Sequence, residues 1–151
     1  MKVRYIVGDL LSVQTGIIVH GCNARGKMGK GVALAIRNKY PSVYKHYLQD
    51  IYGGRLFLGE IQYNRVGNDL YIVNAITQDG YGSGVQVDYD AVYYCFLKLF
   101  SRCTVDNTFS VSVPKTGIGF SGGDFSEILQ TIYSAASDAR WGGTLNIYTP
   151  E

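Results

Sequence analysis

Two glycine-rich segments limit what this chain can fold into more than any other feature of its sequence. The first spans residues 20–33, with loop glycines at positions 26, 29 and 31, and the second spans residues 113–123, with four glycines. Each follows a short apolar run typical of a β-strand and precedes a helical pattern. Glycine lets a backbone approach a ligand closely, and a helix N-terminus offers free N–H groups to an anion. The order strand, glycine-rich loop, helix therefore predicts an α/β fold with an anion site at its strand ends.

The rest of the chain alternates between strand and helix patterns. Strands are predicted at residues 2–7, 17–20, 58–66, 70–76, 109–113 and 144–148, with a tight hairpin turn at 67–69. Helices are predicted to begin near Lys30, Pro41, Asp88 and Asp124, and the two aspartates are expected to act as N-caps. Such alternation favours a mainly parallel sheet with helices on both faces, which binds ligands beyond the carboxyl ends of its strands.

Length and charge narrow the class of protein. A chain of 151 residues has the size of one domain, which we place at 1–151. A net charge of +2 is small for holding a long polyanion, so nucleic acid is not expected as a partner. No apolar run approaches the roughly 20 residues of a membrane span. We therefore expect a cytoplasmic monomer whose partner is a small molecule.

Neither a metal nor a cofactor is predicted. The two histidines are distant in the sequence, and the acidic residues are scattered without the spacing of metal ligands. Cys22, Cys95 and Cys103 form neither a CxxC pair nor an even disulfide framework. Buried, reduced thiols are the expectation.

The first glycine-rich segment is suited to a diphosphate. It is not a Walker A loop, because no Ser or Thr follows a Gly-Lys pair, and it is not a GxGxxG fingerprint. The second segment repeats the arrangement, so two loops would hold one diphosphate from opposite sides. The alternative is that the glycines only turn the chain.

Three landmarks together resemble the macrodomains, a family that binds ADP-ribose. They are Gly8-Asp9-Leu10 after the first strand, Asn23 followed by Gly29 to Ala33, and the late segment Thr116 to Phe120. They occur in the family's order, and the resemblance covers essentially the whole chain. It implies a three-layer α/β/α sandwich with a mixed, mostly parallel central sheet.

The resemblance also implies roles for individual residues. Asp9 would accept a hydrogen bond from the adenine amino group, Leu10 would lie against the adenine, and Asn23 would bind the distal ribose. Backbone amides of both loops would hold the diphosphate, with Phe120 near the distal ribose. The implied ligand-binding residues are Gly8, Asp9, Leu10, Asn23, Gly29, Lys30, Gly31, Val32, Thr116, Gly117, Ile118, Gly119, Phe120 and Ser121. For Asp9 the alternative is a turn or capping residue.

Within the macrodomains, His20-Gly-Cys-Asn and the segment 29–41 are most similar to the branch with the yeast-type ADP-ribose 1''-phosphate phosphatase and the terminal ADP-ribose protein glycohydrolase. That glycohydrolase relies on a lysine and an aspartate where this chain has Gln78 and Ser121, which argues against its chemistry. The resemblance therefore implies a phosphatase that converts ADP-ribose 1''-phosphate to ADP-ribose and phosphate. Alternatives are deacylation of O-acetyl-ADP-ribose or ADP-ribosyl-glutamate, and a non-catalytic module that binds ADP-ribose or an ADP-ribosylated protein.

A phosphatase of this kind needs an acid, an activated water and donors for the phosphate. His20 and Asp124 are the candidate catalytic residues for acid/base work, with Lys30 and the loop amides neutralising charge. His20 has a second interpretation, a core histidine bonded to its surroundings. Asp124 has one too, because Glu127 three residues later makes it a typical helix cap.

Overall fold

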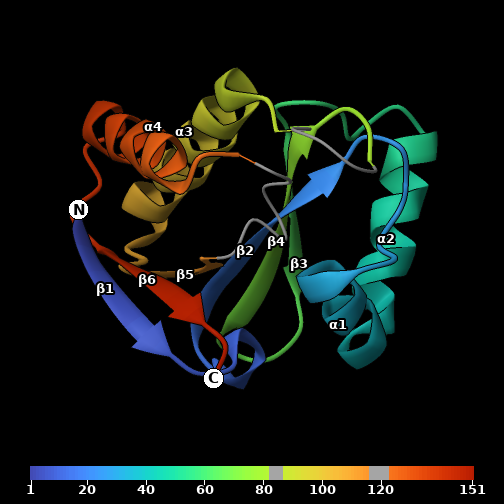
Figure 1. Cartoon of the computed structure of the whole chain (residues 1–151), viewed down its shortest axis with the longest axis horizontal. Coiled ribbons are helices and arrows are strands. Elements are labelled where there is room, and N and C mark those ends of the chain that lie inside the picture. The colour runs from blue at the N-terminus through green and yellow to red at the C-terminus, as the bar shows by residue number, and fades with distance from the viewer. Residues whose placement is uncertain (82–86, 116–122) are drawn as a thin grey trace.

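The computed structural model describes residues 1–81, 87–115 and 123–151, and within these ranges the chain builds one mixed sheet (Figure 1). Its six strands are β1 (Lys2–Val7), β2 (Gly16–Asn23), β3 (Ile61–Arg65), β4 (Leu70–Gln78), β5 (Ser110–Pro114) and β6 (Thr144–Thr149), in the spatial order β1-β6-β5-β2-β4-β3. All neighbouring pairs are parallel except the β3–β4 hairpin, which is antiparallel. The mixed, mostly parallel sheet predicted from the sequence is therefore confirmed.

Helices cover both faces of the sheet, which confirms the three-layer α/β/α arrangement (Figure 1). One layer is formed by α1 (Gly31–Lys39) and α2 (Pro41–Tyr52), and the other by α3 (Tyr89–Asp106) and α4 (Phe125–Asp138). A short 3-10 helix, η1 (Leu10–Ser12), follows β1 and had no counterpart in the sequence prediction. Among the described residues, no helix is long and apolar enough to span a membrane.

Strand boundaries differ from the predicted ones where hydrogen bonding, not hydropathy, decides them. Strand β2 continues past His20 to Asn23, because it stays paired with β4 up to an irregularity between Cys22 and Asn23. Strand β3 begins only at Ile61, because Glu60 donates its N–H to the Phe57 carbonyl and closes a turn. Apolar content alone marks neither boundary.

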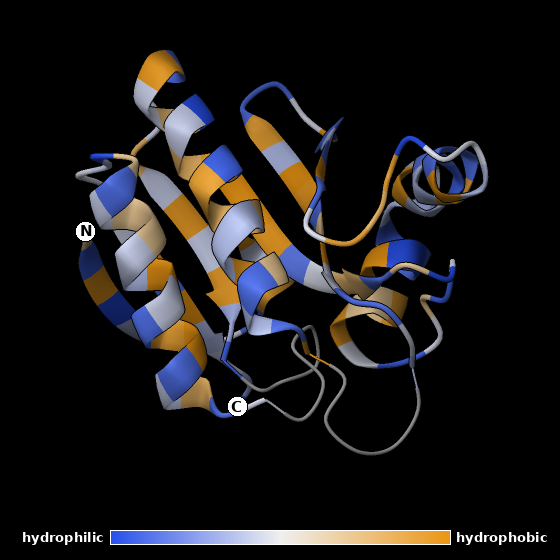
Figure 2. Cartoon of the chain, turned by 90° about the horizontal axis from the view of Figure 1, so that it is seen from above, coloured by the Kyte–Doolittle hydropathy of each residue, from blue (hydrophilic) through white to orange (hydrophobic). Residues whose placement is uncertain are grey.

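The α3–α4 side of the sheet holds the larger apolar core. Asp88 caps α3 by accepting a hydrogen bond from the Ala91 N–H at 3.0 Å, as predicted. Phe96 and Phe100 are fully buried, and the Phe100 ring stacks on Trp141 with centroids 4.4 Å apart. Each helix shows hydrophobic and hydrophilic residues on the same ribbon, as an amphipathic layer over a sheet requires (Figure 2).

The α1–α2 side is divided by a row of polar side chains. His20, Asn74 and Gln62 are direct cross-strand neighbours on β2, β4 and β3, and all three are buried. The apolar residues on this side form two separate clusters. One contains Leu10, Leu11, Ile18, Ile36, Val43, Leu70 and Ile72, and the other contains Cys22, Met28, Ala33, Tyr47, Leu56 and Ile76.

Candidate functional site

A small pocket lies at the carboxyl ends of three parallel strands. Gly8 follows β1, Pro114 ends β5, and Pro150 follows β6. The full lining is Gly8, Asp9, Leu10, Leu11, Val32, Ala35, Pro114, Tyr148 and Pro150. Most of these side chains are apolar, which suits the flat face of a base. The pocket therefore lies at the sheet edge predicted from the glycine-rich segments and includes three of the predicted ligand residues at 8–10.

Asp9 has a structural role beside this pocket. Its Oδ1 accepts a hydrogen bond from the Leu11 N–H at 2.9 Å and so caps η1. The cap fixes the turn that buries Leu10 and Leu11 against the sheet. The capping interpretation of Asp9 is thus confirmed. Its contact with adenine stays a prediction, compatible with the cap because a carboxylate has a second oxygen.

The N-terminus of α1 is left free of any side-chain cap. Lys30 occupies the N-cap position in extended conformation, and its side chain makes no capping hydrogen bond. The first helical bond runs from the Leu34 N–H to the Lys30 carbonyl, so the amides of Gly31 to Ala33 precede the hydrogen-bonded turns. Val32 in this first turn also lines the pocket. Donors suited to a phosphate therefore lie directly beside the apolar pocket.

Asn23 stands at the end of β2 and organises the loop that follows. Its Oδ1 accepts from the N–H groups of Arg25 at 3.0 Å and Lys27 at 3.2 Å, and its Nδ2 donates to the Lys27 carbonyl at 2.8 Å. The hydroxyl of Tyr47, from α2, lies 3.1 Å from the same Oδ1. Contact of Asn23 with a ribose stays a prediction. The sequence did not show that this side chain also holds its own loop.

His20 is completely buried in the middle of the sheet. Its Nε2 lies 2.6 Å from Asn74 Oδ1, and Cys22 Sγ lies 3.5 Å from the same nitrogen. Burial lowers the pKa of His20 to about 4, although the bond to Asn74 works in the opposite direction. His20 is therefore a neutral core histidine near pH 7. This is the alternative that the sequence left open, and the geometry does not fit a group that must touch substrate.

The Asp50 carboxylate, at the outer end of the polar row, determines which way the side-chain amides of Gln62 and Asn74 face. The Gln62 hydrogen bond holds the pKa of Asp50 below its ordinary value, and an ionised carboxylate only accepts. Gln62 Nε2 must therefore face Asp50, at 2.8 Å, which leaves Gln62 Oε1 to accept from Asn74 Nδ2 at 2.9 Å. Asn74 Oδ1 then accepts from His20, which places the imidazole proton on Nε2.

Sequence reasoning missed this row. His46, on α2, bonds Asn64 at 2.7 Å through Nδ1 and Asp50 at 3.2 Å through Nε2, so it forms the outer edge of the same network. The available signal was the position of Gln62 and Asn74, each between two apolar residues of a predicted strand, with Asn64 two positions after Gln62. Buried polar side chains need hydrogen-bond partners, so three of them on adjacent strands are expected to bond to one another.

Asp124 caps α4. Its Oδ1 accepts from the N–H groups of Ser126 at 2.8 Å and Glu127 at 3.3 Å, and its own N–H donates to the Tyr89 hydroxyl at 2.9 Å. The capping interpretation is confirmed, whereas acid/base work by Asp124 stays a prediction. The remaining predicted ligand residues, Thr116, Gly117, Ile118, Gly119, Phe120 and Ser121, lie outside the described residues.

The position that the resemblance assigns to a lysine holds Gln78, the last residue of β4. Its side chain is buried and donates to the Gly80 carbonyl at 2.7 Å. The three cysteines are buried free thiols. Within the described ranges, no group of three or more His, Cys, Asp or Glu residues is placed to hold a metal ion.

The chain is a member of the Macro domain family, whose model matches residues 19–132. A DNA ADP-ribosyl glycohydrolase of Mycobacterium tuberculosis is 28% identical over 137 residues, which cover 88% of this chain and 38% of that protein. An ADP-ribose 1''-phosphate phosphatase of Meyerozyma guilliermondii is 43% identical over 51 residues, which cover 32% of this chain and 29% of that protein.

The solved macrodomain of Mycobacterium tuberculosis DarG superposes on this chain with a TM-score of 0.83 at 26% identity. The match covers 99% of this chain and 98% of that one. In sequence, the chain spans about two-fifths of the length of the glycohydrolases that it matches (38% and 41%).

Proposed function

We propose that this chain binds ADP-ribose and removes a substituent from C1'' of its distal ribose. The observation that carries the proposal is the apolar pocket at Gly8 to Leu11, which adjoins the uncapped N-terminus of α1. An adenine fits the former and a diphosphate the latter, in the order in which ADP-ribose presents them. The distal ribose would then extend toward Asn23, at the end of β2.

The first candidate substrate is ADP-ribose 1''-phosphate. Water would attack the phosphorus, and the bond to the 1'' oxygen would break to release ADP-ribose and inorganic phosphate. The exposed side chain of Lys30 is suited to neutralise the charge of the 1''-phosphate. Asp124 remains the candidate for proton transfer, because His20 is enclosed in the core. The similarity to fungal phosphatases and the presence of Gln78 in place of a lysine support this choice.

The second candidate is an ADP-ribosyl group attached through C1'' to a nucleic acid. The similarity to DNA ADP-ribosyl glycohydrolases covers most of this chain, and the charge distribution agrees with it. Residues 24–56 carry one acid, Asp50, and seven basic residues: Arg25, Lys27, Lys30, Arg37, Lys39, Lys45 and Arg55. The net charge of +2 is the sum over the whole chain, in which acidic residues of the α3–α4 layer offset the basic residues of 24–56. A small net charge is therefore a poor reason to exclude nucleic acid.

Titration calorimetry with ADP-ribose and with AMP is the first test. Binding of ADP-ribose supports the proposal, and no binding contradicts it. Phosphate release from ADP-ribose 1''-phosphate is then compared with release of ADP-ribose from an ADP-ribosylated DNA oligonucleotide. Release from O-acetyl-ADP-ribose or ADP-ribosyl-glutamate alone would identify an esterase instead, and binding without any turnover would identify a non-catalytic module.

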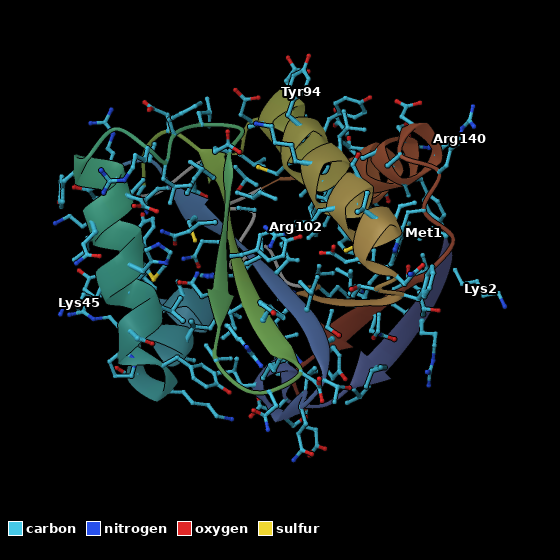
Figure 3. The ribbon with its side chains drawn as sticks, turned by 180° about the vertical axis from the view of Figure 1, so that it is seen from behind. Met1, Lys2, Lys45, Tyr94, Arg102 and Arg140 are labelled. Carbon is cyan, nitrogen blue, oxygen red and sulfur yellow. The ribbon has the colours of Figure 1, made fainter. Side chains whose placement is uncertain are left out.

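A pair of charge variants separates the two substrates further. Lys45 and Lys2 project from opposite ends of the molecule (Figure 3), and both are exposed. If nucleic acid lies along the α1–α2 layer, Lys45→Glu weakens binding of the modified oligonucleotide and lowers its salt dependence, while Lys2→Glu changes neither. Equal effects of the two variants would contradict docking on this layer.

A further inference from the structure

Tyr47 connects helix α2 to Asn23, at the end of β2, and to the loop that follows. Its hydroxyl donates to the Asn23 backbone carbonyl at 2.5 Å and accepts from the Gly26 N–H at 3.1 Å. The side chain belongs to α2 and is completely buried. One hydroxyl thus fixes both ends of the turn from Asn23 to Gly26.

The loop is held against α2 by packing as well as by these bonds. Gly26 has a φ of +82°, and a Cβ at this position would lie 3.0 Å from the Tyr52 hydroxyl oxygen and 3.1 Å from Leu48 Cδ2. The backbone therefore approaches α2 as closely as glycine allows. Beyond the turn, Asn23 is bonded to Lys27, which leads into the free N-terminus of α1.

The position of the Asn23 amide follows from these contacts. Its Oδ1 is occupied by the N–H groups of Arg25 and Lys27, and one N–H of Nδ2 is occupied by the Lys27 carbonyl. The other N–H of this amide has no partner among the described residues, and it is the donor that a ligand would meet. The direction of this N–H depends on the conformation of the turn from Asn23 to Gly26, and the Tyr47 hydroxyl stabilises that turn.

We infer that Tyr47 is a positioning residue that aims the Asn23 amide at the distal ribose, an inference that rests on the proposed function. The phenol does not itself transfer a proton. Burial raises the pKa of Tyr47 well above its ordinary value, so the hydroxyl stays protonated and keeps donating to Asn23.

The variant Tyr47→Phe removes one oxygen and keeps the ring in the apolar cluster. We expect kcat on the preferred substrate to fall on the order of 10-fold to 100-fold, the usual cost of misplacing a group that orients a substrate. Affinity for AMP, which lacks the distal ribose, should change less than about twofold, because the adenine pocket is elsewhere. Tyr44→Phe is the matched control, since Tyr44 is on the same helix and contacts Arg37 through its ring face.

A double-mutant cycle distinguishes positioning from a general loss of structure. If Tyr47 acts through Asn23, Tyr47→Phe lowers kcat in the wild-type background and has little further effect in Asn23→Ala. Equal losses in both backgrounds, or an unchanged kcat in Tyr47→Phe, would overturn the inference. Thermal unfolding of each variant sets an assay temperature at which all are folded.

The two proposals fail in different ways. If the wild-type protein binds ADP-ribose without turning over any substrate, hydrolysis is wrong while positioning is still testable. In that case Tyr47→Phe should weaken ADP-ribose binding and leave AMP binding unchanged. Equal changes for the two ligands would show that Tyr47 does not act at the distal ribose.

Discussion

The two helical layers cover the same sheet but differ in what they contribute. Toward α3 and α4 the sheet presents one large apolar cluster that includes Phe96, Phe100 and Trp141. Toward α1 and α2 it presents two small clusters, separated by the polar row His20, Asn74 and Gln62. The pocket-lining Val32 and the loop at Asn23 both belong to this second side. The face toward α3 and α4 contributes mainly to stability, and the face toward α1 and α2 positions the candidate site.

The layers also differ in charge. The α1–α2 layer has the single acid Asp50 among its basic residues, whereas α3 and α4 with their caps carry six acids and two basic residues. These are Asp88, Asp90, Asp106, Asp124, Glu127 and Asp138 against Lys98 and Arg102. An anionic ligand is therefore favoured on the side where the pocket and the uncapped helix lie.

The largest effect is expected in the α3–α4 core. Phe100→Ala removes a fully buried ring that stacks on Trp141, and it should lower the free energy of unfolding by about 3 to 5 kcal/mol. ADP-ribose affinity of the folded variant should be unchanged. Urea unfolding measures the free energy of unfolding, and calorimetry measures the ADP-ribose affinity. Phe109→Ala, at an exposed position, is the control and should cost less than about 0.5 kcal/mol.

The polar row should make stability depend on pH. His20 has a pKa of about 4 in the folded state against 6.5 in the unfolded chain, so the unfolded state binds more protons between these values. Stability should therefore rise with pH across this window, and about 3 kcal/mol should be lost between pH 7 and pH 4. His20→Gln should flatten this part of the unfolding profile. An unchanged profile would show that His20 is not the group responsible.

The pocket side should respond in affinity more than in stability. Asp9→Ala removes the η1 cap and the predicted adenine contact, so ADP-ribose binding should weaken by about 1 to 3 kcal/mol. Asp9→Asn separates the two roles, because its single oxygen can keep the cap to Leu11 but leaves no acceptor for adenine. Calorimetry should therefore show weaker binding at unchanged unfolding stability. If Asp9→Asn bound ADP-ribose with unchanged affinity, Asp9 would not be the acceptor for the adenine amino group.

The smallest effect on stability is expected at the start of α4. Asp124→Ala should cost about 1 kcal/mol through the lost cap, and Asp124→Ser should restore most of it, since serine is also a good cap. Chemical unfolding measures this difference. Turnover should fall in both variants if the carboxyl group transfers a proton. A full rate in Asp124→Ser would leave Asp124 with its structural role alone.

Much of the fold could be predicted because it depends on local patterns. Strand β1 was predicted at its observed bounds, and Asp88 and Asp124 cap the helices that were assigned to them. Capping and periodicity involve residues a few positions apart, which a single sequence displays directly. The sheet edge at which the pocket lies followed from the rule that parallel strands direct their carboxyl ends to one edge, whereas Gly8, Asp9 and Leu10 were implied by the resemblance to macrodomains.

The candidate site was predicted less completely, because its decisive contacts join distant parts of the chain. His20 could be read as catalytic or as a core residue, and the sequence offered no way to choose. The choice depends on Asn74, 54 positions away, which enters the same row only when β2 pairs with β4. Tyr47 reaches Asn23 only because α2 folds back over the end of β2.

The sequence by itself therefore determined the alternating order of strands and helices, their caps, and the two glycine-rich segments, since these follow from backbone preferences and near neighbours. Tertiary structure alone decided which polar side chains became buried partners and which remained at the surface. The physical reason is that burial changes the chemistry of a group: the same imidazole is a candidate base in water and a neutral hydrogen-bond donor in the core.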